Sequence, residues 1–514
     1  MAYDVIFFVD STVSTWRMRS YGVHRLATEL RSNGYTVKIV DWACKILNNY
    51  RLTTRLLDKL IGDNTLFVGF SGTHFTKHNI TEKTFDHYDN FYDDQGRSLY
   101  HYPCDDKKFE LILDYIHGKN SKIKTVYGGG WAHSSVKLTD KLDYVIYGLA
   151  DATTIELVNH LKHGTPIKFM PGVSPKQKII NHDELGLSFD FPNSLTKYLP
   201  EDHITPGQAL CLETSRGCMF KCKFCSFVLL GRKHTDPKYH KEVSVLAQEL
   251  RNNWDSHKIN RYYIIDDTFN ESTEKLQDVY AAIQQSGVPD IKFFAYMRLD
   301  LLKKYPEQIP LLRDMGLQVA FLGIESLNDE TLKLIGKPMK SAEIKQTLED
   351  LKQQWHGKIN IHGSFVFGLP KDSPEVIDQW MSWVADPECP LDSVVLHTLV
   401  LNPAWPTVFG ENMEKYGYSF DDIDKLGYRH WRIGDYARAD FRRLQFKYEK
   451  SMFYSRRARV GGWEIMGLQN QQRTFEWLYR KPRLDCNRLE ILRELKLEYD
   501  NYITELCAYE GITP

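Results

Sequence analysis

The pattern that most restricts the fold is a series of six candidate strands over residues 208–410, each separated from the next by a stretch with helical periodicity. Their starts lie 26 to 53 residues apart. The candidate strands are Ala209–Glu213, Tyr262–Ile265, Phe293–Met297, Val319–Ile324, His362–Phe367 and Val394–Leu399. Strands that alternate with helices form parallel sheets. Six such units predict a partial or complete β/α barrel of the TIM type, with its chemistry at the C-terminal strand ends.

A second alternation occupies residues 1–162. Its candidate strands are Val5–Val9, Thr36–Val40, Leu66–Phe70, Lys124–Tyr127 and Tyr144–Tyr147, and its candidate helices are Gly22–Asn33, Phe109–Ile116 and Thr153–Leu161. This order predicts an α/β fold with a doubly wound parallel sheet that helices cover on both faces. Residues 71–106 interrupt the rhythm, and we interpret them as an insertion on the ligand side of the sheet.

Two further segments differ in composition from the alternating ones. Residues 163–207 hold six prolines and no sustained periodicity, which predicts a linker. Residues 411–514 show no strand signal, and Leu489–Leu506 has helical periodicity, so we expect an α-rich C-terminal cap.

Composition excludes several classes of protein. The 514 residues carry a formal charge of −1, which excludes a globally basic nucleic-acid binder, and 42% hydrophobic residues exclude a mainly disordered chain. The longest apolar stretches, such as Val394–Leu401, are much shorter than the ~20 residues of a membrane-spanning helix. There is no basic leader before Val5, and nine cysteines are few and odd in number. We therefore expect a cytoplasmic protein with no membrane association and no disulfide scaffold.

Three cysteines, Cys218, Cys222 and Cys225, fall within eight residues after the first barrel strand, in the spacing CxxxCxxC. Three thiolates on one loop can bind three corners of a cubic iron–sulfur cluster and leave the fourth iron open to another ligand. A structural zinc site is the alternative, with His234 as a fourth ligand, but the second CxxC or CxxH pair that such sites use is missing. A third possibility is a chance group of unligated cysteines.

The residues around these cysteines resemble the radical S-adenosylmethionine (radical SAM) superfamily. Phe224 fills the aromatic position of CxxxCx(aromatic)C, and Ser215-Arg216-Gly217 and Ser226-Phe227 flank the motif as in that family. The resemblance implies a [4Fe–4S] cluster on Cys218, Cys222 and Cys225, with S-adenosylmethionine chelated at the open iron. One-electron reduction, by a donor such as flavodoxin or ferredoxin, would cleave S-adenosylmethionine to a 5′-deoxyadenosyl radical that abstracts hydrogen from the substrate.

The next strand ends extend the resemblance. Asp266-Asp267 ends the second barrel strand, where an acidic pair in the family can hold the S-adenosylmethionine ammonium group. The alternative is that Asp267 caps a helix. Arg298 and Glu325 follow the third and fourth strands, and they bind ribose or carboxylate or else pair with each other.

The fifth strand resembles the segment whose backbone meets the adenine. Here Ser364 replaces the first glycine of that segment, Gly368 keeps the second, and Lys371 replaces its terminal acid. Contacts from the backbone of Ser364 and Gly368 should survive these changes, whereas a contact from the acid would not.

Residues 1–162 resemble the cobalamin-binding domain that precedes the barrel in one radical SAM subclass. Ser71, Thr73, Gly128, Gly129 and Gly130 match strand ends that would line the nucleotide tail of the corrin, because small residues let it approach the backbone. The motif that supplies an axial histidine in other cobalamin proteins is not intact, since Thr12 takes the histidine position. The resemblance thus implies cobalamin between this domain and the barrel mouth without protein ligation. The alternative is a degenerate domain that keeps only the fold.

A basic stretch, Tyr436–Arg459, holds eight cations and two acids with aromatic residues between them. Such a stretch can bind nucleic acid or an anionic substrate, or it can be an amphipathic helix with a solvated basic face.

The leading hypothesis is a radical SAM enzyme that uses cobalamin to methylate an unactivated carbon of a small-molecule or nucleotide-like substrate. The enzymatic alternative is a cobalamin-free rearrangement, cyclisation or cleavage, with a nucleotide or nucleic acid as one class of substrate. The non-enzymatic alternative is a nucleic-acid-binding protein with a structural cluster.

Overall fold

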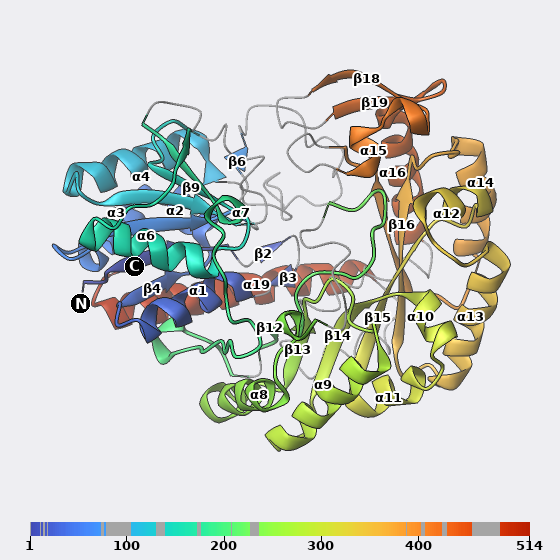
Figure 1. The fold of residues 1–514 in the computed structure, drawn as a ribbon, viewed down its shortest axis with the longest axis horizontal. Coiled ribbons are helices and arrows are strands. Elements are labelled where there is room, and N and C mark those ends of the chain that lie inside the picture. Colours follow the sequence, from blue (N-terminus) through green and yellow to red (C-terminus); the bar gives the residue numbers. More distant parts are fainter. Residues whose placement is uncertain are drawn as a thin grey trace.

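The computed structural model describes residues 2–10, 12–13, 16–17, 19–72, 77–78, 104–129, 139–171, 176–206, 208–226, 236–386, 388–401, 407–423, 429–454 and 484–513. Two sheets dominate it, one built from the first 181 residues and one from residues 210–398 (Figure 1). This arrangement confirms the expected α/β class with two parallel sheets.

The N-terminal sheet has seven strands in the order β10-β11-β9-β8-β5-β1-β4. They are β1 (Val5–Phe8), β4 (Val37–Val40), β5 (Phe67–Ser71), β8 (Lys124–Gly128), β9 (Tyr144–Tyr147), β10 (Met170–Pro171) and β11 (Lys178–Asn181). All pairs are parallel except β10 with β11. The first five strands of this sheet along the chain are β1, β4, β5, β8 and β9. Numbered 1 to 5, they lie side by side in the order 2-1-3-4-5, which is the flavodoxin-like arrangement. Its topological switch point, where ligands bind, lies between β1 and β5.

Helices cover both faces of this sheet, because its strands carry apolar side chains on both faces. Val5 and Phe7 pack on one side with α1 (Tyr21–Ser32) and α6 (Asp151–His163). Ile6 and Phe8 pack on the other side. The helices on that side are α2 (Ala43–Asn48), α3 (Tyr50–Leu60), α4 (Asp106–Lys119) and α19 (Leu484–Glu510). A pleated strand sends neighbouring side chains to opposite faces, so an all-apolar strand such as β1 requires a cover on each side.

The barrel sheet has six parallel strands in sequence order, which form a partial barrel. They are β12 (Leu210–Leu212), β13 (Arg261–Ile264), β14 (Lys292–Met297), β15 (Leu317–Glu325), β16 (Asn360–Phe367) and β17 (Ser393–Thr398). The helices that surround them in Figure 1 are α8 (Val243–His257), α9 (Thr273–Ser286), α10 (Leu299–Lys304), α11 (Gln308–Met315), α12 (Asp329–Ile335), α13 (Ser341–Gln354) and α14 (Pro374–Val384). Rings of Tyr263, Phe294 and Phe321 cluster together, and Tyr21 of α1 packs on this cluster.

The last quarter of the chain contains strands as well as helices. The elements are α15 (Val408–Glu411), β18 (Tyr418–Ile423), β19 (Arg429–Ile433), β20 (Tyr436–Ala437) and α16 (Arg438–Tyr454). The three strands form an antiparallel sheet. The remaining short elements are β2 (Thr12–Val13), β3 (Trp16–Arg17), β6 (Lys77–His78), β7 (Cys104–Asp105), α7 (His182–Leu185) and the 3₁₀ turns Pro200–Asp202, Pro237–Tyr239 and Glu414–Tyr416.

Two of these segments contain strands that the sequence did not predict. Residues 163–207 are not only a linker, since β10 and β11 extend the N-terminal sheet; two-residue β10 is too short to show periodicity. Residues 411–514 are mainly helical in their described part, through α16 and α19, but the strands β18–β20 precede these helices and α19 packs with the N-terminal sheet. The hydroxyl oxygen of Tyr502 in α19 accepts a hydrogen bond from the backbone N–H of Asp41, although these residues are 461 positions apart. In the described part of the chain, no helix is long and apolar enough to cross a membrane.

The basic stretch forms α16 as far as Tyr454, and Arg456, Arg457 and Arg459 lie outside the described residues. Phe441 and Leu444 are buried in the barrel core, while Arg443 and Lys447 are exposed and pair with Asp440 and Asp378. For the residues described, the stretch is thus an amphipathic helix that packs against the barrel.

Candidate functional site

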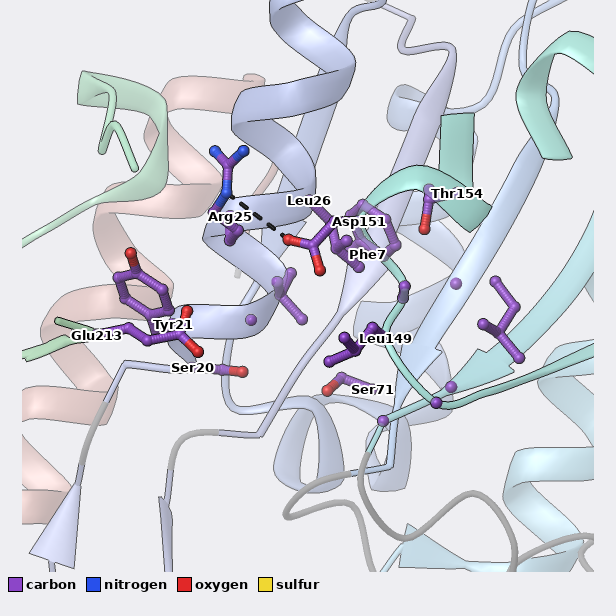
Figure 2. Close-up of a pocket in the computed structure, with 18 of the residues that line it drawn as sticks. Phe7, Ser20, Tyr21, Arg25, Leu26, Ser71, Leu149, Asp151, Thr154 and Glu213 are labelled. Atoms are coloured by element: carbon purple, nitrogen blue, oxygen red, sulfur yellow. Dashed lines mark ion pairs between the residues drawn. The ribbon is translucent and has the colours of Figure 1, made fainter. Parts of the chain in front are cut away.

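A cavity of about 310 Å³ lies where the C-terminal strand ends of the N-terminal sheet meet the start of the barrel (Figure 2). The N-terminal sheet contributes Phe7, Ser71, Gly128 and Gly129, among others. The barrel contributes Glu213, Ser215, Arg216, Gly217 and Asp267. The cavity therefore joins the switch point of one sheet to the mouth of the other, which are the places where both folds bind ligands.

Glycine shapes the sheet side of the cavity. At Gly69 a Cβ atom would lie 2.8 Å from the Phe7 ring. Gly129 has a φ of +117°, a backbone angle that residues other than glycine rarely adopt. The expected lining residues Ser71, Gly128 and Gly129 all face the cavity. Thr73, Gly130 and most of the insertion at 71–106 lie outside the described residues. A small-residue wall at the switch point fits the nucleotide tail that the sequence predicts.

A charged network forms part of the cavity wall. The Asp151 carboxylate accepts a hydrogen bond of 2.8 Å from Arg216 Nη1. Arg25 Nε lies 3.7 Å from the other oxygen of Asp151, the ion pair drawn in Figure 2. Arg216 also donates to both oxygens of Glu213, at 2.9 and 3.0 Å. Burial alone would lower the pKa of Arg216, but the two carboxylates raise it, so Arg216 remains a cation.

The three cysteines lie on the loop after β12, which we call the cysteine loop (residues 213–226). Cys218 is buried, with its Sγ 3.2 Å from Thr268 Oγ1, while Cys222 and Cys225 are half-buried. The backbone N–H of Cys225 donates to the carbonyl of Cys222 at 3.0 Å, which closes a turn. Burial raises the pKa of the Cys218 thiol despite the Thr268 hydrogen bond.

The described residues contain no group of three or more His, Cys, Asp or Glu side chains in an arrangement that could hold a metal ion. The fit to a cluster therefore rests on the donor set, which is three thiols on one short loop at a strand end. Sulfur donors suit iron–sulfur clusters, and this loop meets the mouth of the barrel. His234, the fourth ligand of the zinc alternative, lies outside the described residues.

Asp266 anchors the first residues of the cysteine loop by hydrogen bonds. Its Oδ1 accepts the backbone N–H groups of Thr214 and Ser215 at 2.7 and 3.1 Å, and its Oδ2 lies 2.8 Å from Lys275 Nζ. The hydroxyls of Thr214 and Ser215 also donate to Oδ2. Burial alone would raise the pKa of Asp266, but Lys275 and these hydrogen bonds lower it. Asp266 is therefore an ionised structural carboxylate, whereas its neighbour Asp267 lines the cavity.

Asp267 does not cap a helix, contrary to the alternative that the sequence allowed. The following helix, α9, begins at Thr273, and the Ser272 side chain caps it by accepting from the Lys275 N–H. Of the acidic pair, Asp267 thus remains the candidate for a ligand ammonium group.

Arg298 and Glu325 make ion pairs with different residues. Arg298 forms a two-point contact with Asp300 at 3.0 and 3.1 Å, donates to Cys222 Sγ at 3.4 Å and stacks 3.8 Å from the Phe220 ring. Glu325 lies 3.6 Å from Lys337. The expectation that they pair with each other is thus wrong as a direct contact. Arg298 thus places a cation within hydrogen-bonding distance of the Cys222 sulfur.

The fifth barrel strand is covered by the C-terminal sheet. Ser364 is buried within β16, and Gly368 follows the strand with a φ of +83°. The Gly368 N–H donates to Asp372 at 3.1 Å, and its carbonyl accepts the Tyr418 hydroxyl at 2.8 Å. A Cβ at Gly368 would lie 2.3 Å from the Trp431 ring. The N–H of Gly368 is therefore engaged within the protein, which weighs against its expected contact with adenine.

Asp372 is a residue that the sequence reasoning missed. It accepts the N–H groups of Gly368 and Leu369 at 3.1 and 3.0 Å, so it orders the turn after β16. Burial raises its pKa to about 7. An acid just before the helix-start pair Ser373-Pro374 was the available signal.

Phe224, the aromatic residue of the cysteine motif, packs half-buried against the barrel core.

Comparison with known proteins now places the barrel in a family. Residues 212–384 match the model of the radical SAM superfamily. The chain carries a radical SAM domain. An uncharacterized methyltransferase from Pyrococcus horikoshii is 27% identical over 279 residues, which cover 50% of this chain and 57% of that protein. The chain thus spans about half the length of this sequence relative.

Solved structures extend the fold similarity to nearly the whole chain. The cobalamin-dependent radical enzyme OxsB, with aqua-cobalamin and S-adenosylmethionine bound, superimposes with a TM-score of 0.63 at 14% identity, covering 100% of this chain and 82% of that chain. The methyltransferase TsrM from Kitasatospora setae, with cobalamin and a [4Fe–4S] cluster bound, gives 0.59 at 13% identity, covering 96% and 100%. The chain therefore shares the two-sheet fold of these two solved structures.

Proposed function

We propose that this protein is a cobalamin-dependent radical SAM enzyme that methylates an unactivated carbon of a small-molecule substrate. The observation that carries the proposal is the single cavity lined by Ser71 and Gly129 on one side and by Arg216, Gly217 and Asp267 on the other. A cobalamin tail at the switch point and a cluster at the cysteine loop would lie at its two ends. The names of its relatives, which include methyltransferases, favour methyl transfer.

When bound, the [4Fe–4S] cluster supplies the electron that cleaves S-adenosylmethionine, and cobalamin supplies the methyl group. The residues of the chain hold and orient these groups. Cys218, Cys222 and Cys225 would ligate the cluster, and Arg298 would stabilise the thiolate of Cys222, its neighbour at 3.4 Å. Asp267 would accept the ammonium group of S-adenosylmethionine. Ser71, Gly128 and Gly129 would hold the cobalamin tail.

The substrate and the electron donor follow from the same proposal. Reduction of the cluster requires a one-electron donor, and we propose one of the flavodoxin or ferredoxin class. The Arg443 and Lys447 side chains of α16 already pair with Asp440 and Asp378, which favours a solvated helix face over a nucleic-acid surface. We therefore propose a small molecule rather than a nucleic acid as the substrate.

Anaerobic reconstitution tests the proposal. The protein is loaded with iron and sulfide, with and without hydroxocobalamin, then reduced in the presence of S-adenosylmethionine. We expect one cobalamin bound per chain, an iron–sulfur absorbance near ~400 nm and cleavage of S-adenosylmethionine to 5′-deoxyadenosine. Replacement of Cys218, Cys222 and Cys225 together by Ala should remove the absorbance and the cleavage, whereas Cys389→Ala, on a buried cysteine outside the cysteine loop, should keep both.

The alternatives predict different results. Cleavage without cobalamin uptake would refute methyl transfer and favour a cobalamin-free rearrangement. A cluster with no cleavage, together with tight binding of nucleic acid, would favour the non-enzymatic alternative. Full cleavage by the triple cysteine variant would refute the assignment of the cluster ligands.

A further inference from the structure

The Arg216 side chain crosses from the cysteine loop to the N-terminal sheet. Its Nη1 and Nη2 atoms donate to Asp151 at 2.8 and 3.3 Å, while Nε and Nη2 donate to Glu213 of its own loop. The guanidinium also lies 4.7 Å from the Phe191 ring. Because the planar guanidinium group of Arg216 is bound by a carboxylate on each of two edges and by an aromatic ring on one face, it has little freedom to move.

Asp151 is fixed from the opposite side. It is the first residue of α6, where a carboxylate is favourable near the helix N-terminus, and it is only 5% exposed. Arg25 of α1 lies 3.7 Å from it and donates to the Leu195 carbonyl at 2.7 Å. Asp151 therefore bridges a helix of the N-terminal sheet to the cysteine loop, between two arginines.

The cysteine loop is tied to the N-terminal sheet by a second contact as well. The Lys241 N–H donates to the Thr214 carbonyl at 3.0 Å, and Lys241 forms a fully buried ion pair with Glu249. The Tyr21 hydroxyl of α1 accepts from Lys241 at 2.7 Å and donates to Glu249 at 3.3 Å. The backbone on both sides of Ser215 is thus connected to α1 or α6.

We propose that Asp151 and Arg216 are positioning residues that couple ligand binding in the cavity to the placement of the cysteine loop. Both residues line the cavity, so a ligand that fills it contacts the pair itself. Only Gly217, with a φ of +78°, separates Arg216 from Cys218. A displacement of Asp151 would therefore move Cys218, the first cluster ligand, through Arg216 and Gly217. This inference rests on the proposed function, in which the ligand is cobalamin.

Coupling between two sites is reciprocal and measurable as a change in affinity. The test measures the affinity of the anaerobically reconstituted full chain for S-adenosylmethionine, from the change in the absorbance of the cluster before reduction, with and without hydroxocobalamin. Without an added electron S-adenosylmethionine binds but is not cleaved. Hydroxocobalamin should change that affinity by about fivefold or more in the wild type, the lower end of typical coupling. In Asp151→Asn and Arg216→Lys the change should fall below about twofold, while cluster content stays near wild type.

Arg31→Lys is the matched control. Arg31 makes a two-point contact with Asp202 at 2.9 and 3.1 Å, also between α1 and a distant segment, but it does not line the cavity. It should keep the wild-type response to hydroxocobalamin. Because the two test variants break one pair from opposite sides, the pair can be tested even if one of them fails to assemble a cluster.

Three results would overturn the coupling: no effect of hydroxocobalamin in the wild type that has bound it, an unchanged effect in both test variants, or an equal loss in Arg31→Lys. Failure of the wild type to bind hydroxocobalamin, seen directly in the absorbance of cobalamin, would instead refute the proposed function, and the coupling with it.

Discussion

The two neighbouring carboxylates Asp266 and Asp267 should respond to substitution in opposite ways. Asp266→Ala removes the nearer of the two carboxylates of the buried Lys275 ammonium, at 2.8 Å against 3.5 Å for Glu271, and deprives two backbone N–H groups of the cysteine loop of their acceptor. Removal of one member of a buried ion pair costs about 3–5 kcal/mol. For a domain of about 200 residues that corresponds to a fall of roughly 6–20 °C in Tm.

Asp267→Ala removes a half-buried carboxylate that lines the cavity and should change Tm by less than about 2 °C. It should instead weaken S-adenosylmethionine binding by about tenfold or more, the value of a charge-assisted hydrogen bond of 1.5–3 kcal/mol. Thermal unfolding, iron content and titration of S-adenosylmethionine on the two reconstituted variants separate these roles. Equal losses of stability, or a loss of S-adenosylmethionine affinity in Asp266→Ala alone with Tm unchanged, would refute the assignment.

Three further substitutions test other parts of the structure. Gly129→Leu puts a side chain into the cavity at a φ of +117° and should abolish hydroxocobalamin binding while the cluster still assembles; retained binding would place cobalamin elsewhere. Gly368→Ala should lower the free energy of unfolding by about 2–5 kcal/mol, from its φ of +83° and the contact with Trp431. In a Trp431→Ala background the cost should fall to about 1–2 kcal/mol, and an unchanged cost would argue against the steric contact. Burial raises the pKa of Asp372 to about 7, so the folded state favours the neutral carboxyl and loses that stability as pH rises. Relative to Asp372→Asn, the wild type should lose about 2–3 kcal/mol between pH 5 and pH 8, and a constant difference in urea unfolding would contradict this.

The strand–helix alternation was sufficient to predict most of the fold. The strand Val5–Phe8 is a continuous apolar run because both of its faces are buried, and that signal is visible without a structure. The antiparallel strands β18 and β19 were missed because they are short and rich in charged residues, and because a bulge between Phe420 and Asp422 breaks the alternation of polar and apolar residues in β18. The position of α19 beside the N-terminal sheet depends on contacts hundreds of residues apart, such as Lys38 with Glu510 at 2.8 Å, which no local pattern encodes.

Candidate site residues could be proposed from the sequence where spacing within one segment carries the chemistry. The three cysteines and the small residues Ser71, Gly128 and Gly129 were named from their motifs and strand ends, and the last three line the cavity. Their roles as ligands remain a prediction. The separate roles of Asp266 and Asp267 could not be predicted, because these roles depend on which of the two adjacent side chains points inward to Lys275. The Arg216–Asp151 contact joins two sheets, so neither partner could be selected from its own surroundings in the sequence.

The central claim is that one cavity between the two sheets serves both cofactors. Anomalous diffraction at the iron and cobalt absorption edges, on crystals of the protein reconstituted with iron, sulfide and hydroxocobalamin, tests it most directly. The account predicts an iron signal beside Cys218, Cys222 and Cys225 and a cobalt signal in the cavity that Ser71, Gly129 and Arg216 line. A cobalt signal outside that cavity, or an iron signal away from the cysteine loop, would contradict it.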